Sequence, residues 1–349
     1  MKKFFAILLC AIMVLAVVAC DTGAKEAEYK LGMGVVVSMD SSKTGNAQVD
    51  ATVATVVTDA DGKIVACRID VAQSKMNVAG GAVDTAKVFE TKMELGTRYN
   101  MAAYGSDNNG DNIVLEWDAQ TKIFEEYVVG MTAAEVEAIE LQEVNAHMIA
   151  VDSELLTAGC TMQITDFMEA IVKACNDEQG MTFKAVAGTF TLGVAANTTA
   201  EESTAATADA NGVVKMYTDF AASVVADGKI IATLNDAIQP QIAINAAGEC
   251  TPAEFKGTQR ELKEGYNMAT YGASMDPNGD GVVYEWYVQS ETFSKHVVGM
   301  TAAEVAGMGT AANSIGYQMS TDADLVAAGC TIQITAIKAV VAKSANNAR

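Results

Sequence analysis

Histidine is scarce in this sequence, which has only two in 349 residues. His147 and His296 do not occupy equivalent positions in the two copies of an internal repeat, so a histidine-based triad or metal site common to both copies is excluded. The sequence also has no glycine-rich phosphate loop, dinucleotide-binding motif or nucleophile elbow at a strand-to-helix turn. These absences argue against hydrolases and nucleotide-binding proteins.

The cysteines lack the spacing of a metal or disulfide framework. Of the seven, Cys10 and Cys20 fall in the amino-terminal leader, and the other five include no CxxC pair. Because these five cysteines are odd in number and lack such spacing, we expect most of them to be buried in the core, where they act as small hydrophobic residues. These five are Cys67, Cys160, Cys175, Cys250 and Cys330.

Proline and basic residues are also few. With three prolines and half of its residues hydrophobic, the chain is expected to fold around real cores, and its length favours two domains. Lys and Arg number 23 against 44 Asp and Glu; without Lys2 and Lys3 the balance is 21 minus 44, or -23. Such a charge excludes nucleic acid as a partner and repels anionic lipid surfaces.

The amino terminus has the form of a secretory leader. Residues 1–20 read MKKFFAILLCAIMVLAVVAC, with two lysines, an apolar run and small residues before Cys20. The ending resembles a bacterial lipobox, which implies that Cys20 carries lipid. We therefore expect a protein of the cell envelope, outside the cytoplasm, held at a membrane by lipid and without a transmembrane helix. An ordinary signal peptide cut near Ala19 is the alternative.

An internal repeat organises the rest of the chain. LTAGCTMQIT at 156–165 recurs as VAAGCTIQIT at 326–335, and VVGMTAAEV at 128–136 recurs unchanged at 297–305. The offset between partners drifts from 166 to 170 residues, as small loop insertions would produce. The sequence therefore predicts two homologous tandem domains at 29–177 and 184–344, joined by a linker at 178–183.

Each copy reads as an antiparallel sheet with helices packed on it. Asp-Gly at 61–62 and at 227–228 lies between two apolar runs, which is a strong hairpin signal. Helices are expected near Trp117 and Trp286, after Thr132 and Thr301 as amino-terminal caps, and after the repeated motif at 165–175 and 335–345. This order predicts an α+β fold.

The repeated Ala-Gly-Cys-Thr turn, with the Asp-Gly-Lys-Ile strand upstream and Met-Thr-Ala-Ala-Glu-Val between, resembles the FMN-binding domain family. That family occurs in the C subunit of the sodium-pumping NADH:quinone oxidoreductase and in bacterial flavin-carrying lipoproteins. The resemblance implies FMN attached through phosphate to Thr161 and Thr331 by a separate flavin transferase. Gly159 and Gly329 would let the backbone approach the phosphate, and an exposed threonine hydroxyl is expected. The alternative is a buried turn, repeated because the domain is repeated.

A second candidate site is an acidic loop in each copy. Carboxylate and amide side chains at alternate positions suit a hard cation such as calcium. The twelfth position is Asp118 in the first copy and Tyr287 in the second, so an EF-hand is incomplete. Asn, Asp and Gly are also ordinary turn residues. The candidate calcium ligands are Asp107, Asn109 and Asp111 in the first copy and Asp276, Asn278 and Asp280 in the second.

Repeated aromatic residues offer a third candidate site. They could stack on a flavin or another planar ligand, or they could anchor a core. They are Tyr99, Tyr104 and Trp117, with Tyr266, Tyr271 and Trp286 as their counterparts.

Two functions follow from these features. The first is a lipid-anchored flavoprotein that relays electrons between membrane redox partners and has no substrate chemistry of its own. The second is a non-catalytic surface lipoprotein that binds a small ligand, calcium or a protein partner.

Overall fold

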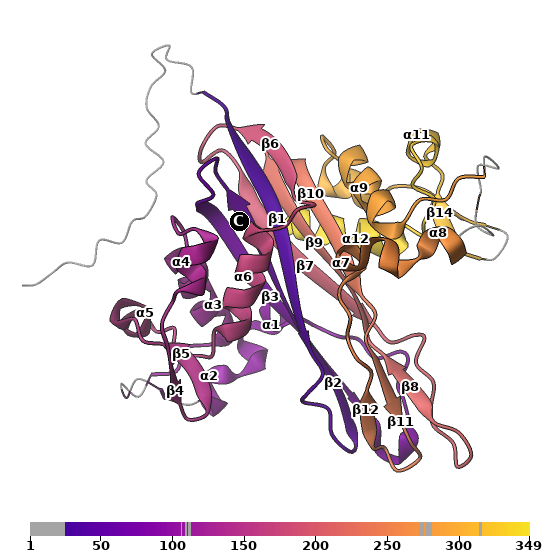
Figure 1. Ribbon diagram of the computed structural model, residues 1–349, viewed down its shortest axis with the longest axis horizontal. Helices are drawn as coiled ribbons and strands as arrows, with labels where there is room; N and C mark the ends of the chain where they lie inside the picture. The colour runs from indigo at the N-terminus through magenta and orange to yellow at the C-terminus, as the bar shows by residue number, and fades with distance from the viewer. Residues whose placement is uncertain are drawn as a thin grey trace, which may run out of the picture.

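The computed structural model describes residues 25–105, 107–108, 110, 113–271, 276, 281–313 and 316–349, without the side chain of Tyr271. We refer to residues 29–177 as the first repeat and to residues 184–344 as the second. The chain has an α+β fold with antiparallel sheets, as predicted (Figure 1).

Two antiparallel sheets form the centre of the molecule. The first has the strand order β3-β2-β1-β6 and the second has the order β10-β9-β7. Their strands are β1 (Ala27–Ser38), β2 (Asn46–Thr58), β3 (Ile64–Asn77), β6 (Met181–Ala185), β7 (Thr191–Thr199), β9 (Tyr217–Ala226) and β10 (Lys229–Ile238).

Smaller sheets lie outside this centre. A three-stranded sheet at the far end of the body comprises β8 (Gly212–Lys215), β11 (Gln241–Ile244) and β12 (Cys250–Pro252) (Figure 1). Two hairpins are β4 (Leu141–Val144) with β5 (His147–Ala150), and β13 (Thr310–Ala312) with β14 (Gln318–Ser320).

The helices follow the same order in both repeats. In the first they are α1 (Lys92–Leu95), α2 (Met101–Tyr104), α3 (Trp117–Tyr127), α4 (Ala133–Glu137), α5 (Ser153–Ala158) and α6 (Thr165–Cys175). In the second they are α7 (Gln259–Leu262), α8 (Met268–Tyr271), α9 (Trp286–His296), α10 (Ala302–Ala306), α11 (Ala323–Ala327) and α12 (Thr335–Asn346). Three 3-10 turns are η1 (Ala79–Gly81), η2 (Gly96–Tyr99) and η3 (Lys263–Tyr266).

The two sheets pack face to face and share one hydrophobic core. Strand alternation turns Leu31 and Val35 of β1 into this core, where they join Leu192, Phe220 and other residues of the second repeat. The predicted linker provides the first residues of β6, which pairs with β1. Segments on both sides of the 178–183 boundary are therefore joined through a common core and a common sheet.

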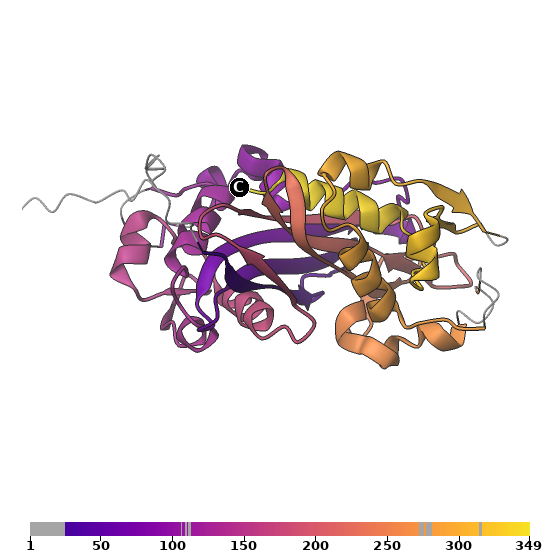
Figure 2. The same ribbon diagram turned by 90° about the horizontal axis from the view of Figure 1, so that it is seen from above.

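Helices cover the outer face of each sheet. The pink helix α6 and the yellow helix α12 lie on opposite sides of the strands (Figure 2). Both approach the strands closely at a glycine, because a Cβ on Gly32 would lie 1.9 Å from the Ala174 carbonyl oxygen, and one on Gly193 would lie 2.0 Å from that of Ser344. The result is a four-layer arrangement with a separate helix-to-sheet core in each repeat.

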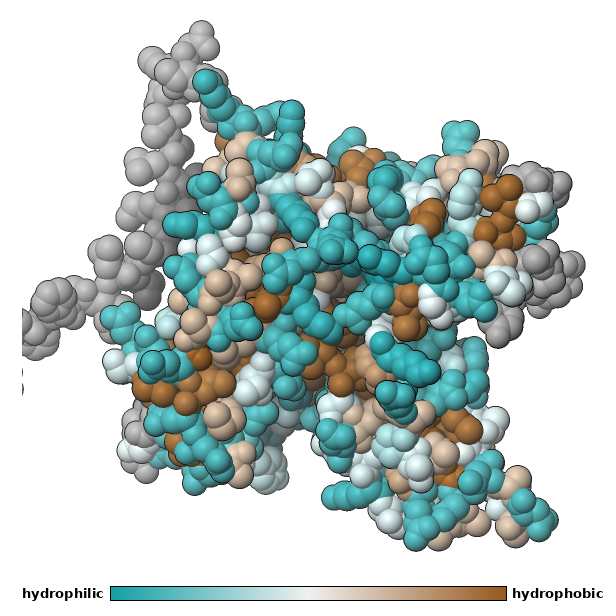
Figure 3. Space-filling view, viewed as in Figure 1, coloured by the Kyte–Doolittle hydropathy of each residue, from teal (hydrophilic) through white to brown (hydrophobic). Residues whose placement is uncertain are grey.

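Exposed large hydrophobic side chains are spread along the described part of the chain, from Val88 to Tyr317. On the face shown in Figure 3, hydrophilic residues predominate and hydrophobic residues form small separate groups. Among the described residues, none of the helices combines the length and the apolar character needed to cross a membrane.

Candidate functional site

The repeated Ala-Gly-Cys-Thr turn has nearly the same geometry in both repeats. Gly159 follows α5 with φ of 105°, and Gly329 has φ of 95°. A Cβ on Gly159 would lie 2.6 Å from Leu115 Cδ1, and one on Gly329 would lie 2.6 Å from Tyr284 Cε2. The glycines are therefore needed both for the left-handed backbone and for the side chain that covers each turn.

The two threonines lie inside the protein. Thr161 is 2% exposed and Thr331 is 6% exposed, so the expectation of an exposed hydroxyl is wrong. The backbone N–H of Thr161 donates to Gln120 Oε1 at 2.9 Å, and that of Thr331 donates to Gln289 Oε1 at 2.7 Å. The Thr331 hydroxyl also donates to Gln289 Oε1, at 3.2 Å. Each turn is thus fixed to the helix that begins at the repeated tryptophan.

The acidic loops are only partly described. Asp107 accepts a hydrogen bond from the Gly110 N–H at 2.8 Å, and Asp276 accepts one from the Gly281 N–H at 2.7 Å, as expected of turn residues. Asn109, Asp111, Asn278 and Asp280 lie outside the described residues. Within the part of the chain that the structure describes, no group of three or more His, Cys, Asp or Glu side chains is placed to hold a metal ion. The calcium site stays a prediction.

In the first repeat, side chains of the protein itself cover the repeated rings. The Lys92 ammonium lies 4.9 Å from the centroid of the Tyr99 ring and 5.4 Å from that of the Trp117 ring. The Phe167 ring packs edge-on against Trp117 with centroids 5.8 Å apart. Tyr104, which is 85% exposed, takes no part in this cluster. These rings therefore anchor a core in the first repeat.

In the second repeat, the equivalent rings line a cleft of about 370 Å³. Sequence register places Gln259 where the first repeat has Lys92, and Ile337 where it has Phe167. Because both replacements shorten the side chain, the space beside Tyr266 and Trp286 stays open. We call this space the second-repeat cleft. Its lining comprises Thr199, Glu201, Glu202, Lys215, Tyr217, Thr218, Asp219, Ala237, Ile238, Gln239, Gln259, Tyr266, Met268, Trp286, Tyr317, Ile332, Gln333, Ala336 and Ile337.

The cleft adjoins the repeated motif and a second hollow. Ile332 and Gln333 come directly after Thr331, so the motif supplies part of the wall although its threonine is buried. A neighbouring cleft of about 340 Å³ shares Gln239, Gln259 and Tyr266 with the second-repeat cleft. The Tyr266 hydroxyl donates to Gln239 Oε1 at 3.3 Å across this boundary.

Acidic groups outnumber basic ones in the lining of the second-repeat cleft. Glu201, Glu202 and Asp219 face a single Lys215, whose ammonium is paired with Glu202 at 3.3 Å. Burial raises the pKa of Asp219 to about 7, and the nearby carboxylate of Asp236 acts in the same direction. The cleft therefore gains negative charge as the pH rises through neutrality.

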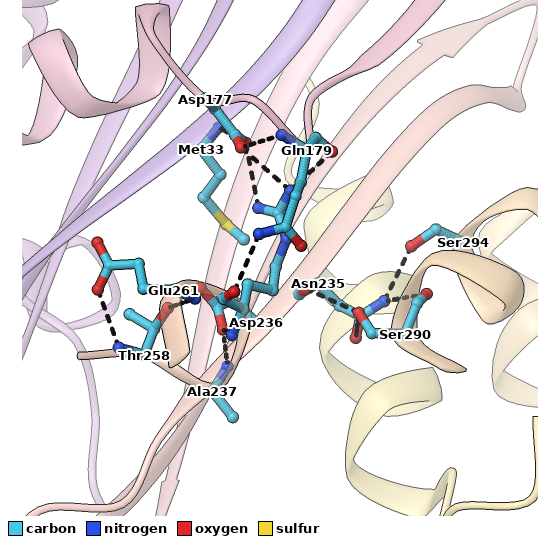
Figure 4. Close-up of polar contacts among 11 residues, drawn as sticks. Met33, Asp177, Gln179, Asn235, Asp236, Ala237, Thr258, Glu261, Ser290 and Ser294 are labelled. Atoms are coloured by element: carbon cyan, nitrogen blue, oxygen red, sulfur yellow. Dashed lines mark hydrogen bonds and ion pairs between the residues drawn. The ribbon is translucent and has the colours of Figure 1, made fainter. Parts of the chain in front are cut away.

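Asp236 has a different role from Asp219. Its Oδ1 accepts from the N–H groups of Ala237 at 2.8 Å and Arg260 at 3.0 Å, and Figure 4 shows it beside Thr258 and Ala237. In the first repeat Asp70 accepts in the same way from Val71 and Met93. Burial raises the pKa of Asp236 to about 6, against the opposing effect of Arg260. Asp236 therefore holds α7 in place.

Sequence reasoning missed Asp219 and Gln259. A detectable signal was present in the comparison of the two copies, because TKMELGTRYNM at 91–101 exchanges its lysine for glutamine in TQRELKEGYNM at 258–268. Asp219 gave no such signal. It lies in β9, where it pairs with Asn197, and the residues around it come from segments distant in the sequence.

Comparisons with known proteins give no relative: no protein-family model, curated protein or solved structure matches this chain. The resemblance to the FMN-binding family stays a prediction.

Proposed function

We propose that the chain is a non-catalytic binding protein of the cell envelope, held at a membrane through lipid on Cys20, whose second repeat holds a small organic ligand. The observation that carries the proposal is the contrast between two equivalent places. Lys92 and Phe167 cover the rings in the first repeat, whereas Gln259 and Ile337 leave the second-repeat cleft open. Ring-lined concave sites with a few polar groups are typical of ligand-binding proteins.

The proposal assigns binding without covalent attachment. The rings of Trp286 and Tyr266 line the cleft, and Gln239, Tyr217 and Asp219 add polar groups to its wall. The lining of the cleft includes no histidine. Of the neighbouring carboxylates Asp219 and Asp236, Asp219 lines the wall, whereas Asp236 is engaged in holding α7. These residues are therefore suited to binding and orienting a ligand, and not to making or breaking a covalent bond.

A second candidate function is the electron carrier with FMN on Thr161 and Thr331. The duplication of the turn geometry favours it, because both threonines follow a left-handed glycine and both donate their N–H to a glutamine. In this candidate, the burial of each hydroxyl requires the turn to open before a flavin transferase can reach it.

Native mass spectrometry of the protein purified from its own cells distinguishes these functions. We expect a small-molecule adduct that is lost on denaturation and is absent from the Ile337→Phe variant, which carries the residue of the first repeat. The Phe167→Ile variant is the matched control and retains the adduct. A denatured mass that carries FMN supports the second candidate, whereas an adduct that survives Ile337→Phe contradicts binding in the cleft.

A further inference from the structure

Two side chains in the lining of the second-repeat cleft carry acceptor groups without a partner among the described residues. Asp219 lines the cleft, and its carboxylate has no hydrogen-bond or ion-pair partner among the described residues. Gln259 is 5% exposed, and its Oε1 is a buried acceptor that also lacks a partner there. A buried polar atom left unpaired costs about 1–3 kcal/mol, so a ligand that donates to it is favoured.

Within the Gln259 amide, the oxygen is the atom without a partner among the described residues. Its Nε2 already donates to the Tyr266 hydroxyl at 3.0 Å, and that hydroxyl donates to Gln239. The amide orientation is thereby assigned by its partners. A ligand that brings a hydrogen-bond donor to this place would satisfy the unpaired Gln259 Oε1.

The first repeat shows which charge suits this place. There the ammonium of Lys92 lies over the rings of Tyr99 and Trp117, within about 6 Å of both centroids, a distance at which cation–π attraction is effective. The second repeat keeps both rings as Tyr266 and Trp286 but has Gln259 in place of the lysine. Among the described residues, no ammonium lies over the rings of Tyr266 and Trp286 as Lys92 does in the first repeat; the ammonium of Lys215 lies 5.7 Å from the centroid of the Tyr217 ring instead.

A third observation concerns charge at the wall. The residue equivalent to Asp219 in the first repeat is Thr52, because each stands one position before the strand residue paired with Asp70 or Asp236. The negative charge is thus present only in the repeat that lacks the lysine. Glu201 and Glu202 add to it, while Lys215 offsets one charge.

From these observations we propose that the second-repeat cleft binds a small organic ammonium ion. Its N–H groups donate to Asp219 and to Gln259 Oε1, and its charge lies against the rings of Trp286 and Tyr266. This inference rests on the proposed function and narrows it to a ligand class, a protonated amine.

The test is calorimetric titration of the full chain with 2-phenylethylamine and with its neutral analogue 2-phenylethanol, at about pH 8. We expect the amine to bind about tenfold more tightly than the alcohol, or better, since hydrogen bonds to charged groups are worth about 1.5–3 kcal/mol. Asp219→Asn should remove this preference and leave alcohol binding unchanged, which also shows that the variant is folded. Asp227→Asn removes a charge from an exposed turn of the same repeat and should keep the preference.

Equal affinity of the unaltered protein for amine and alcohol would overturn the inference, as would an unchanged preference in Asp219→Asn. The proposed function would then still stand on the adduct that Ile337→Phe removes. If that adduct is also insensitive to Ile337→Phe, the proposed function itself fails. A trimethylated amine cannot donate to Gln259 Oε1, so it should bind more weakly than 2-phenylethylamine; equal or tighter binding would overturn the part given to Gln259.

Discussion

The Arg260 guanidinium lies 3.1 Å from the Asp177 carboxylate, and this ion pair joins α7 of the second repeat to the segment that follows α6 of the first. The side chains are 7% and 9% exposed. Asp177 also accepts from the Met33 N–H at 3.2 Å, while Arg260 donates to the Gln179 carbonyl oxygen at 2.7 Å. Figure 4 shows Asp177, Gln179 and Met33 gathered at this junction.

Removing one partner of this buried pair should be costly. We expect Asp177→Asn to lower the free energy of unfolding by about 3 kcal/mol, because Arg260 would remain buried without its counter-charge. Urea denaturation followed by circular dichroism measures the change. Glu178→Gln breaks the neighbouring exposed pair with Lys263, whose side chains are 83% and 42% exposed, and should cost less than about 1 kcal/mol. Similar losses in both variants would contradict this reading of the junction.

Local features of the fold could be predicted from the sequence, because they depend on residues close together in the chain. Thr132 with Glu135 and Thr301 with Glu304 form capping boxes, as predicted. The helices expected at 165–175 and 335–345 are α6 and α12, with one residue added to the second. The α+β class followed from such elements.

Features that depend on distant contacts could not be predicted in this way. The hydrophobic strands on each side of residues 178–183 gave no indication that their faces meet in one core, or that β6 pairs back with β1. The small residues around Thr161 indicated an accessible turn. In the structure the turn is buried, and its Thr161 N–H donates to the side chain of Gln120, forty-one residues earlier in the chain. The second-repeat cleft is open because Ile337 is smaller than Phe167 of the first repeat. From the sequence alone, a smaller side chain is equally consistent with a cleft and with a core that neighbouring side chains fill.

Protonation of Asp219 should make stability depend on pH. Its pKa is raised to about 7 in the folded protein from an ordinary value near 3.8, so the folded state binds a proton more tightly than the unfolded state. The corresponding stability is fully present below about pH 4 and is lost as the pH rises to about 7. The groups that face Asp219 are Asp236, Glu201, Glu202, Lys215, Tyr217 and Tyr266.

Asp219→Asn isolates this effect. We expect the variant to be more stable than the unaltered protein by about 2 kcal/mol near pH 8, with little difference near pH 4. Thermal unfolding at a series of pH values measures it, with Asp227→Asn as the control. A difference that grows toward low pH would show that the sign is wrong.

Exchanging the lysine between the repeats should exchange their properties. Gln259→Lys places an ammonium beside Tyr266 and Trp286, so we expect it to weaken 2-phenylethylamine binding about tenfold and to raise the free energy of unfolding by about 1 kcal/mol. Lys92→Gln should lower that free energy by a similar amount. Calorimetry and urea denaturation give the two readouts. Undiminished amine binding in Gln259→Lys would place the ligand elsewhere.

Because Thr161 and Thr331 are both buried, we expect no covalent FMN on the folded protein. Coexpression with a flavin transferase should leave the denatured chain without an FMN increment, since neither hydroxyl is accessible in the folded protein. Intact-protein mass spectrometry measures this, with Thr161→Ala and Thr331→Ala beside it. Increments that disappear one by one in these variants would establish the electron carrier instead.

We expect the second repeat to bind a ligand at the place that Lys92 and Phe167 fill in the first repeat. A crystal structure of the protein with 2-phenylethylamine would show this. We predict density for the amine between Asp219, Gln259 and the ring of Trp286, and none beside Trp117, where Lys92 and Phe167 lie. An empty second-repeat cleft, or equal occupancy at Trp117, would contradict the account.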